Sequence, residues 1–160
     1  VLTGAIDLHA HHGPDAYDRQ WDAFEVVKLA KEREMLRVVA DQHGVPTSAK
    51  LLAEMSKMLV EKLDKDRKNF PFGIYHVAPK GETTWFHYAK FVIGEAMKRG
   101  DTFKLNLENL FGIKTEEYPL PAKRPQNSRL NTSHFQKTFG VTLPSWEAGI
   151  LAIMDALYRG

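Results

Sequence analysis

Short runs of β-forming residues alternate with amphipathic helical patterns along this chain, and this alternation constrains the fold more than any other feature. Residues 5–9, 36–40 and 73–78 are predicted strands, because each is short, largely apolar and closely followed by a Gly/Pro turn. Helical patterns separate them. Strands that alternate with helices are typical of an α/β protein.

The predicted helices cover residues 21–33, about 51–63, 85–97 and a last stretch that begins near Ser145. Thr47 or Ser48 can cap the second helix, and Thr83 or Thr84 the third, by accepting a hydrogen bond from a free backbone N–H. The clearest apolar face is that of the second helix, formed by Leu51, Leu52, Met55, Met58, Leu59 and Leu63.

Residues 102–130 show no periodicity and contain Pro119, Pro121 and Pro125. We expect a long ordered loop with short extended pieces. Loops of this length inside a compact domain are usually functional or disordered.

Composition excludes several classes of protein. The 160 residues are 43% hydrophobic with a net charge of +2, which suits a globular domain and gives no reason to expect nucleic acid or a membrane surface as partner. Cysteine is absent, so disulfides and thiolate zinc sites are excluded and a cytoplasmic location is expected. No apolar run approaches the roughly 20 residues that span a bilayer, and the N-terminal segment does not have the pattern of a signal peptide.

Four motifs occur in an informative order. Residues 38–47 read VVADQHGVPT, and residues 73–77 read GIYHV, with Gly81 and Thr84–Trp85 following. Residues 118–130 read YPLPAKRPQNSRL, the most specific of the four, and residues 143–146 read LPSW. From about residue 30 to 158 the chain therefore resembles the substrate-binding part of the dTDP-4-dehydrorhamnose reductase family, in the extended short-chain dehydrogenase/reductase group.

The resemblance implies a partial substrate-binding lobe with an incomplete Rossmann sheet, a dTDP-sugar ligand and a place in dTDP-rhamnose biosynthesis. Family members use NADPH, but no G-x-x-G-x-x-G turn for its pyrophosphate occurs here. None of the five tyrosines begins the family's Tyr-x-x-x-Lys pair; Tyr75 with Lys80 and Tyr88 with Lys90 have the wrong spacing. We therefore expect a nucleotide-sugar binding fragment that is inactive alone, and leave open whether it is an enzyme.

Two segments supply the expected ligand contacts. Arginine offers a bidentate fork for phosphate oxygens, and Asn and Ser add neutral hydrogen bonds. Arg124 could instead pair with Glu116 or Glu117, and Thr47 could be only a helix cap. The predicted substrate-binding residues are Gln42, Gly44, Pro46, Thr47, Arg124, Pro125, Asn127 and Ser128.

Several other conspicuous residues are expected in the core. His76, in an apolar predicted strand, is interpreted as a buried histidine with satisfied hydrogen bonds. The same core assignment is made for Trp85, Tyr88, Trp146, Met55 and Met58.

The first residues have a different character. Residues 6–15 read IDLHAHHGPD and resemble the first strand of an amidohydrolase-type metal enzyme. His9 and His11 would lie on one face of a strand, where a divalent metal could activate water. A metal-dependent hydrolase is thus the alternative function, although such enzymes are barrels of about 250 residues.

Together the two resemblances predict a hybrid chain. Residues 1–35 would be an amidohydrolase-like strand and helix packed on a nucleotide-sugar-binding lobe formed by residues 36–160, with the junction near residues 29–38. A lobe without its nucleotide-binding sheet should expose apolar surface. We therefore expect a homodimer, or a missing catalytic domain as partner.

Overall fold

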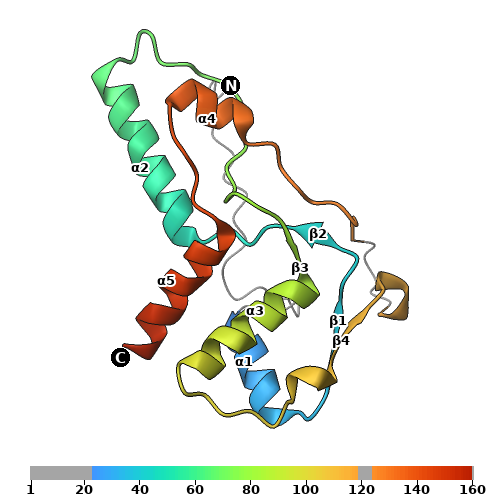
Figure 1. Cartoon of the computed structure of the whole chain (residues 1–160). Helices are drawn as coiled ribbons and strands as arrows, with labels where there is room; N and C mark the ends of the chain where they lie inside the picture. The colour runs from blue at the N-terminus through green and yellow to red at the C-terminus, as the bar shows by residue number, and fades with distance from the viewer. Residues whose placement is uncertain (1–22, 119–123, 160) are drawn as a thin grey trace, which may run out of the picture.

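A computed structural model describes residues 23–118 and 124–159 (Figure 1). In chain order its elements are α1 (Ala23–Glu32), β1 (Leu36–Val39), β2 (His43–Gly44), α2 (Ala49–Lys65), β3 (Thr83–Thr84), α3 (Trp85–Lys98), β4 (Leu110–Ile113), α4 (Ser133–Phe139) and α5 (Trp146–Tyr158), with 3-10 turns at Leu107–Asn109 and Thr115–Glu117. The predicted α/β class is confirmed, and the four predicted helices and strand 36–40 that fall in this part are present.

A two-stranded parallel sheet lies against the first hydrophobic core. β1 pairs with β4 in a register that sets Leu36 opposite Leu110 and Val39 opposite Ile113. α1 contributes Val26 and Ala30, both fully buried. The core is completed mainly by α3 and α5, through residues that include Tyr88, Ala89, Val92, Ile93, Ala96, Trp146, Ile150 and Met154.

A second hydrophobic core joins α2 and α4 at the other end of the molecule (Figure 1). Phe135 of α4 is fully buried there, and Phe139 is 6% exposed. Leu51 and Leu59 of α2 complete it together with Leu143. The apolar face predicted for residues 51–63 therefore packs against α4 in this second core.

Three helices, α2, α3 and α5, begin close to where the sequence predicts. Ser48 Oγ accepts from Leu51 N at 3.2 Å, Thr84 Oγ1 from His87 N at 3.3 Å, and Ser145 Oγ from Ala148 N at 3.3 Å. Each cap satisfies one of the N–H groups that an α-helix leaves free at its start.

Two expectations need correction. Residues 73–78 are not a strand: within the described residues the segment joins no ladder, because β propensity cannot supply a partner strand. His76 is exposed rather than buried. In the stretch 102–130, β4 is a short extended piece that joins a sheet.

One further element, α4, was not predicted. Its seven residues are followed by the capping residue Gly140, whose φ of 64° lies in the left-handed region. Such a short helix carries too little periodicity to be recognised in a sequence.

The predicted strand 5–9 lies outside the described residues. Within them, α1 packs on the same core as β1 and α3, while the domain division at residue 35 stays a prediction. No described helix is long and apolar enough to cross a membrane.

Candidate functional site

The turn after β1 is fixed by the segment after β4. Asp41 Oδ1 accepts from Thr115 Oγ1 at 2.6 Å, and both carboxylate oxygens accept from Thr115 N, at 3.0 and 3.1 Å. These hydrogen bonds, above all the one from the Thr115 side chain, lower the pKa of Asp41. Gln42 Nε2 donates to the same hydroxyl at 3.1 Å, which orients the buried Gln42 side chain.

The next two residues, β2, lie between two other segments. On one side β2 pairs antiparallel with β3, His43 opposite Thr84 and Gly44 opposite Thr83. On the other side, His43 N donates to Gln126 O at 2.7 Å and Ser128 N donates to His43 O at 2.8 Å. Residues far apart in the chain are thereby brought together.

A pocket of about 290 Å³ opens where these three segments meet. Its walls combine the β1–α2 turn, the start of α3 and the segment that begins at residue 124. The residues that line it are Gln42, His43, Gly44, Val45, Pro46, Thr83, Thr84, Trp85, Tyr88, Arg124, Pro125 and Ser128.

Six of the eight predicted substrate-binding residues line this pocket, namely Gln42, Gly44, Pro46, Arg124, Pro125 and Ser128. Thr47 follows Pro46 but does not line it. Asn127 is exposed, and its Oδ1 accepts from Arg129 N at 3.1 Å and from Arg129 Nε at 2.9 Å. Asn127 therefore fixes the loop around Arg129 instead of facing the pocket. Whether any of these residues binds ligand stays a prediction.

The charged residues near the pocket differ in whether they form ion pairs. Arg129 Nη1 lies 2.5 Å from Glu82 Oε2, and this hydrogen bond lowers the pKa of Glu82. Glu117, an expected alternative partner of Arg124, pairs with Arg37 at 2.7 Å instead. Within the described residues no ion pair involves Arg124, which is exposed at the pocket.

Sequence reasoning missed part of the lining. Trp85 and Tyr88 were assigned to the core; Tyr88 is buried and Trp85 half-buried, and both also face the pocket. Thr83 and Thr84 were considered only as caps. The helix-cap pattern placed these threonines at the start of α3, but only the β2–β3 pairing brings that helix end to Gln42 and Arg124.

The alternative metal site, predicted at His9 and His11, lies outside the described residues. Among the described residues, no three His, Cys, Asp or Glu side chains are grouped so that they could hold a metal. The metal-hydrolase alternative therefore gains no support from the part of the chain that the structure describes.

The known proteins with similar sequences include several dTDP-4-dehydrorhamnose reductases. The dTDP-4-dehydrorhamnose reductase of Escherichia coli K12 is 41% identical over 133 residues, which are 83% of this chain and 43% of that protein. The reductase of Burkholderia thailandensis is 33% identical over 135 residues, 82% of this chain and 45% of that protein. The chain thus spans less than half the length of these relatives.

Solved structures agree with the sequence relatives. The dTDP-4-dehydrorhamnose reductase of Bacillus anthracis, in complex with NADP, superposes with a TM-score of 0.70 at 29% identity, over 88% of this chain and 44% of that one. The Clostridium acetobutylicum protein gives the same TM-score at 27% identity, over 88% of this chain and 45% of that one.

A family model described as the RmlD substrate binding domain matches residues 17–159. The resemblance therefore starts earlier than the predicted residue 30 and takes in all of α1. Because the match covers most of the sequence, the chain belongs to the RmlD substrate-binding domain family.

Proposed function

We propose that this chain is the nucleotide-sugar-binding part of a dTDP-4-dehydrorhamnose reductase-like protein of dTDP-rhamnose biosynthesis. The observation that carries the proposal is the pocket that joins the 42–46 turn, the start of α3 and the 124–128 segment. Two of these segments contain the residues predicted from the sequence to contact a dTDP-sugar.

The pocket's chemistry suits one part of such a ligand. Arg124 offers a guanidinium that is not committed to a carboxylate of the described residues, and arginine binds phosphate oxygens in a bidentate manner. The Trp85 ring and Pro46 offer apolar surface for a sugar or base, and Gln42 adds an amide for hydrogen bonding. Ligand pockets usually measure about 300–1,000 Å³. At about 290 Å³ this one suits a portion of a nucleotide-sugar.

Hydride transfer is not part of the proposed activity of this chain alone. NADPH binding needs a Gly-rich turn at a helix start, and carbonyl reduction needs a positioned acid. Neither the G-x-x-G-x-x-G turn nor the Tyr-x-x-x-Lys pair occurs in the 160 residues. We propose that a dinucleotide-binding domain, comparable to the remainder of the relatives, must complete the site.

Calorimetric titration with dTDP-glucose and with dTDP tests the binding proposal. We expect heat from both, and Arg124→Ala should raise the Kd at least about tenfold through loss of a charge-assisted hydrogen bond. Arg67→Ala, at an exposed arginine beyond α2, is the matched control and should leave the Kd unchanged. Absence of binding by the unmodified chain would overturn the proposal, and equal effects of the two substitutions would remove Arg124 from the site.

A second assay tests the missing chemistry. The purified chain, mixed with NADPH and dTDP-4-dehydrorhamnose, should leave the NADPH absorbance unchanged. Steady NADPH oxidation that scales with protein concentration would contradict the proposal that a second domain is required.

A further inference from the structure

One pocket residue, Gln42, combines near-complete burial with an unpaired hydrogen-bonding group. Gln42 is 7% exposed and lines the candidate pocket. Its Nε2 donates to Thr115 Oγ1 at 3.1 Å, but among the described residues no hydrogen bond reaches its carbonyl oxygen, Oε1. Buried polar groups are nearly always hydrogen-bonded, because an unpaired one costs the full desolvation penalty of that group. Gln42 Oε1 therefore needs a donor that the described part of the chain does not supply.

The hydrogen-bond chain behind Gln42 fixes which end of its amide faces Thr115. Hydrogen bonds from Thr115 lower the pKa of Asp41 from its ordinary 3.8, so this carboxylate is ionised at neutral pH and can only accept. A hydroxyl has one hydrogen to donate, and that of Thr115 goes to Asp41 Oδ1 at 2.6 Å. Thr115 Oγ1 can then only accept from Gln42, and only the NH2 end of the amide can donate to it.

A second glutamine makes the same contact without an unpaired group. Gln136 Nε2 also donates to a threonine hydroxyl, Thr132 Oγ1, at 3.0 Å, but its Oε1 accepts from Leu143 N at 3.3 Å. Both ends of that amide are satisfied within the chain, and Gln136 does not line the candidate pocket. Gln42 differs at the carbonyl end, which leaves that oxygen for a ligand.

We propose that Asp41 and Thr115 are positioning residues that hold the Gln42 carbonyl oxygen toward the pocket, so that the site selects a ligand group that donates a hydrogen bond. The inference rests on the proposed function, because it assigns a polarity to the same pocket. A dTDP-sugar offers such a donor in its thymine imide N–H, its deoxyribose hydroxyl and its hexose hydroxyls. A site built to pair with a donor rejects an analogue that lacks it far more strongly than an apolar pocket rejects a change of size.

Nuclear magnetic resonance of the free chain tests the orientation of the amide without any ligand. The Gln42 side-chain NH2 protons, assigned by their absence from Gln42→Met, should show strong Overhauser contacts to Thr115. Thr115→Val should speed their exchange with water at least about fivefold, because it removes their acceptor. Thr115→Ser should restore slow exchange. Thr132→Val, which removes the equivalent hydroxyl beside Gln136, is the matched control and should leave it unchanged. Equal exchange in Thr115→Val and the unmodified chain overturns the proposed orientation.

Calorimetric titration tests the ligand preference with pairs of ligands. dTDP is compared with 3-N-methyl-dTDP for the imide and with 2′,3′-dideoxythymidine diphosphate for the deoxyribose hydroxyl, and dTDP-glucose is compared with dTDP for the hexose. The unmodified chain should prefer the ligand with the donor at least about tenfold in one of the three pairs. Thr115→Val should reduce that preference to about twofold or less, whereas Thr115→Ser and Thr132→Val should retain it.

The outcomes distinguish this inference from the proposed function. A chain that binds none of these ligands overturns the proposed function, and the exchange measurement then decides for or against the orientation. Binding with the same preferences in Thr115→Val and the unmodified chain overturns the positioning role. A Kd raised equally for both members of every pair would show that Thr115 supports only the structure of the pocket, and it would overturn the inference as well.

Discussion

At the scale of single residues, the site depends on Asp41 and Thr115. Asp41 is the last charged residue before the pocket, and its carboxylate receives both the backbone N–H and the hydroxyl of Thr115. Because Gln42 donates to the same hydroxyl, the geometry of one pocket residue follows from a contact made outside the pocket.

Replacing Asp41 by Asn should lower the free energy of unfolding by about 1 kcal/mol at neutral pH, through loss of charge-assisted hydrogen bonds. The pKa of Asp41 is lowered in the folded chain, so its contribution is complete above the ordinary value of 3.8 and is lost as pH falls through the folded pKa. Urea unfolding should therefore show a gap between variant and unmodified chain that shrinks in acid. Asp64→Asn, at an exposed position of α2, is the control; a gap independent of pH would contradict this reading.

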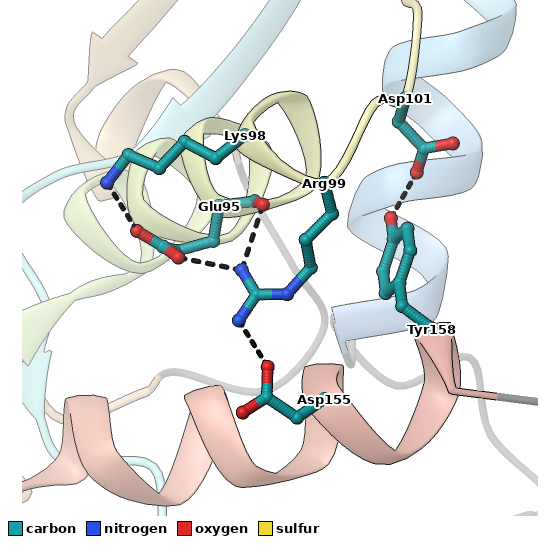
Figure 2. Close-up of polar contacts among 6 residues, drawn as sticks. All are labelled: Glu95, Lys98, Arg99, Asp101, Asp155 and Tyr158. Atoms are coloured by element: carbon teal, nitrogen blue, oxygen red, sulfur yellow. Dashed lines mark hydrogen bonds and ion pairs between the residues drawn. The ribbon is translucent and has the colours of Figure 1, made fainter.

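At the scale of elements, polar contacts tie the end of α3 to α5 at one end of the first core (Figure 2), and an ion pair adds α1. Arg99, just after α3, donates to Glu95 of α3 at 2.7 Å and to Asp155 of α5 at 2.6 Å. Asp101 pairs with Lys31 of α1 at 2.6 Å and accepts a hydrogen bond from the Tyr158 hydroxyl of α5. The last turn of α5 is thus held to the residues that follow α3 and, through Asp101, to α1.

Arg99→Met should lower the Tm more than Lys98→Met. Arg99 is 19% exposed and links two helices, whereas Lys98 is 72% exposed and, among the described residues, forms an ion pair only with Glu95 on its own helix. Exposed pairs contribute little and are screened by salt. Thermal unfolding at low and high salt should show the difference between the variants shrink with salt. Equal Tm values in low salt would contradict the bridging role.

Tyr158 gives α5 a pH dependence. Partial burial and the adjacent Asp101 carboxylate raise the pKa of Tyr158 to about 12 from an ordinary 10.0. A raised pKa means a contribution to stability that is complete below 10 and is lost as pH rises toward 12. Tyr158→Phe should remove a step near pH 12 from the tyrosinate absorbance titration and reduce the loss of stability across this window. A titration unchanged by the substitution would refute the assignment.

At the scale of the whole molecule, two hydrophobic cores share one short chain. The first holds α1, α3, α5 and the β1–β4 sheet; the second joins α2 to α4. In Figure 1 the α2–α4 end stands away from α1 and α3. The second core should therefore open locally more readily than the first.

Phe135→Ala tests this arrangement. Phe135 is fully buried, so its removal should cost about 3–5 kcal/mol. Hydrogen exchange should accelerate more in α2 and α4 than in α3. The matched control, Phe111→Ala on β4, removes a ring that is already 43% exposed and should cost much less. Uniform acceleration across α2, α3 and α4 would show that the two cores unfold as one unit.

Much of the fold and part of the site could be predicted from the sequence alone. The apolar periodicity from Leu51 to Leu63 and the hydroxyl caps Ser48, Thr84 and Ser145 are local, so their consequences appear where the residues stand. The unusual segments around Gln42 and Arg124 marked the candidate ligand loops and the family. These features could be predicted without tertiary information, because they depend on residues that are close together in the chain or on the order of the motifs.

Tertiary structure decided which segments meet. β4 becomes a strand only through its pairing with β1, and residues 73–78 join no ladder within the part of the chain that the structure describes. Thr83 and Trp85 joined the pocket only through the contact of β2 with β3. Strand pairing and pocket walls depend on contacts between residues far apart in the chain, which local propensity does not encode. The sequence by itself determined the longer helices, their caps and the family, while the structure decided the sheet partners, the pocket and the short helix α4.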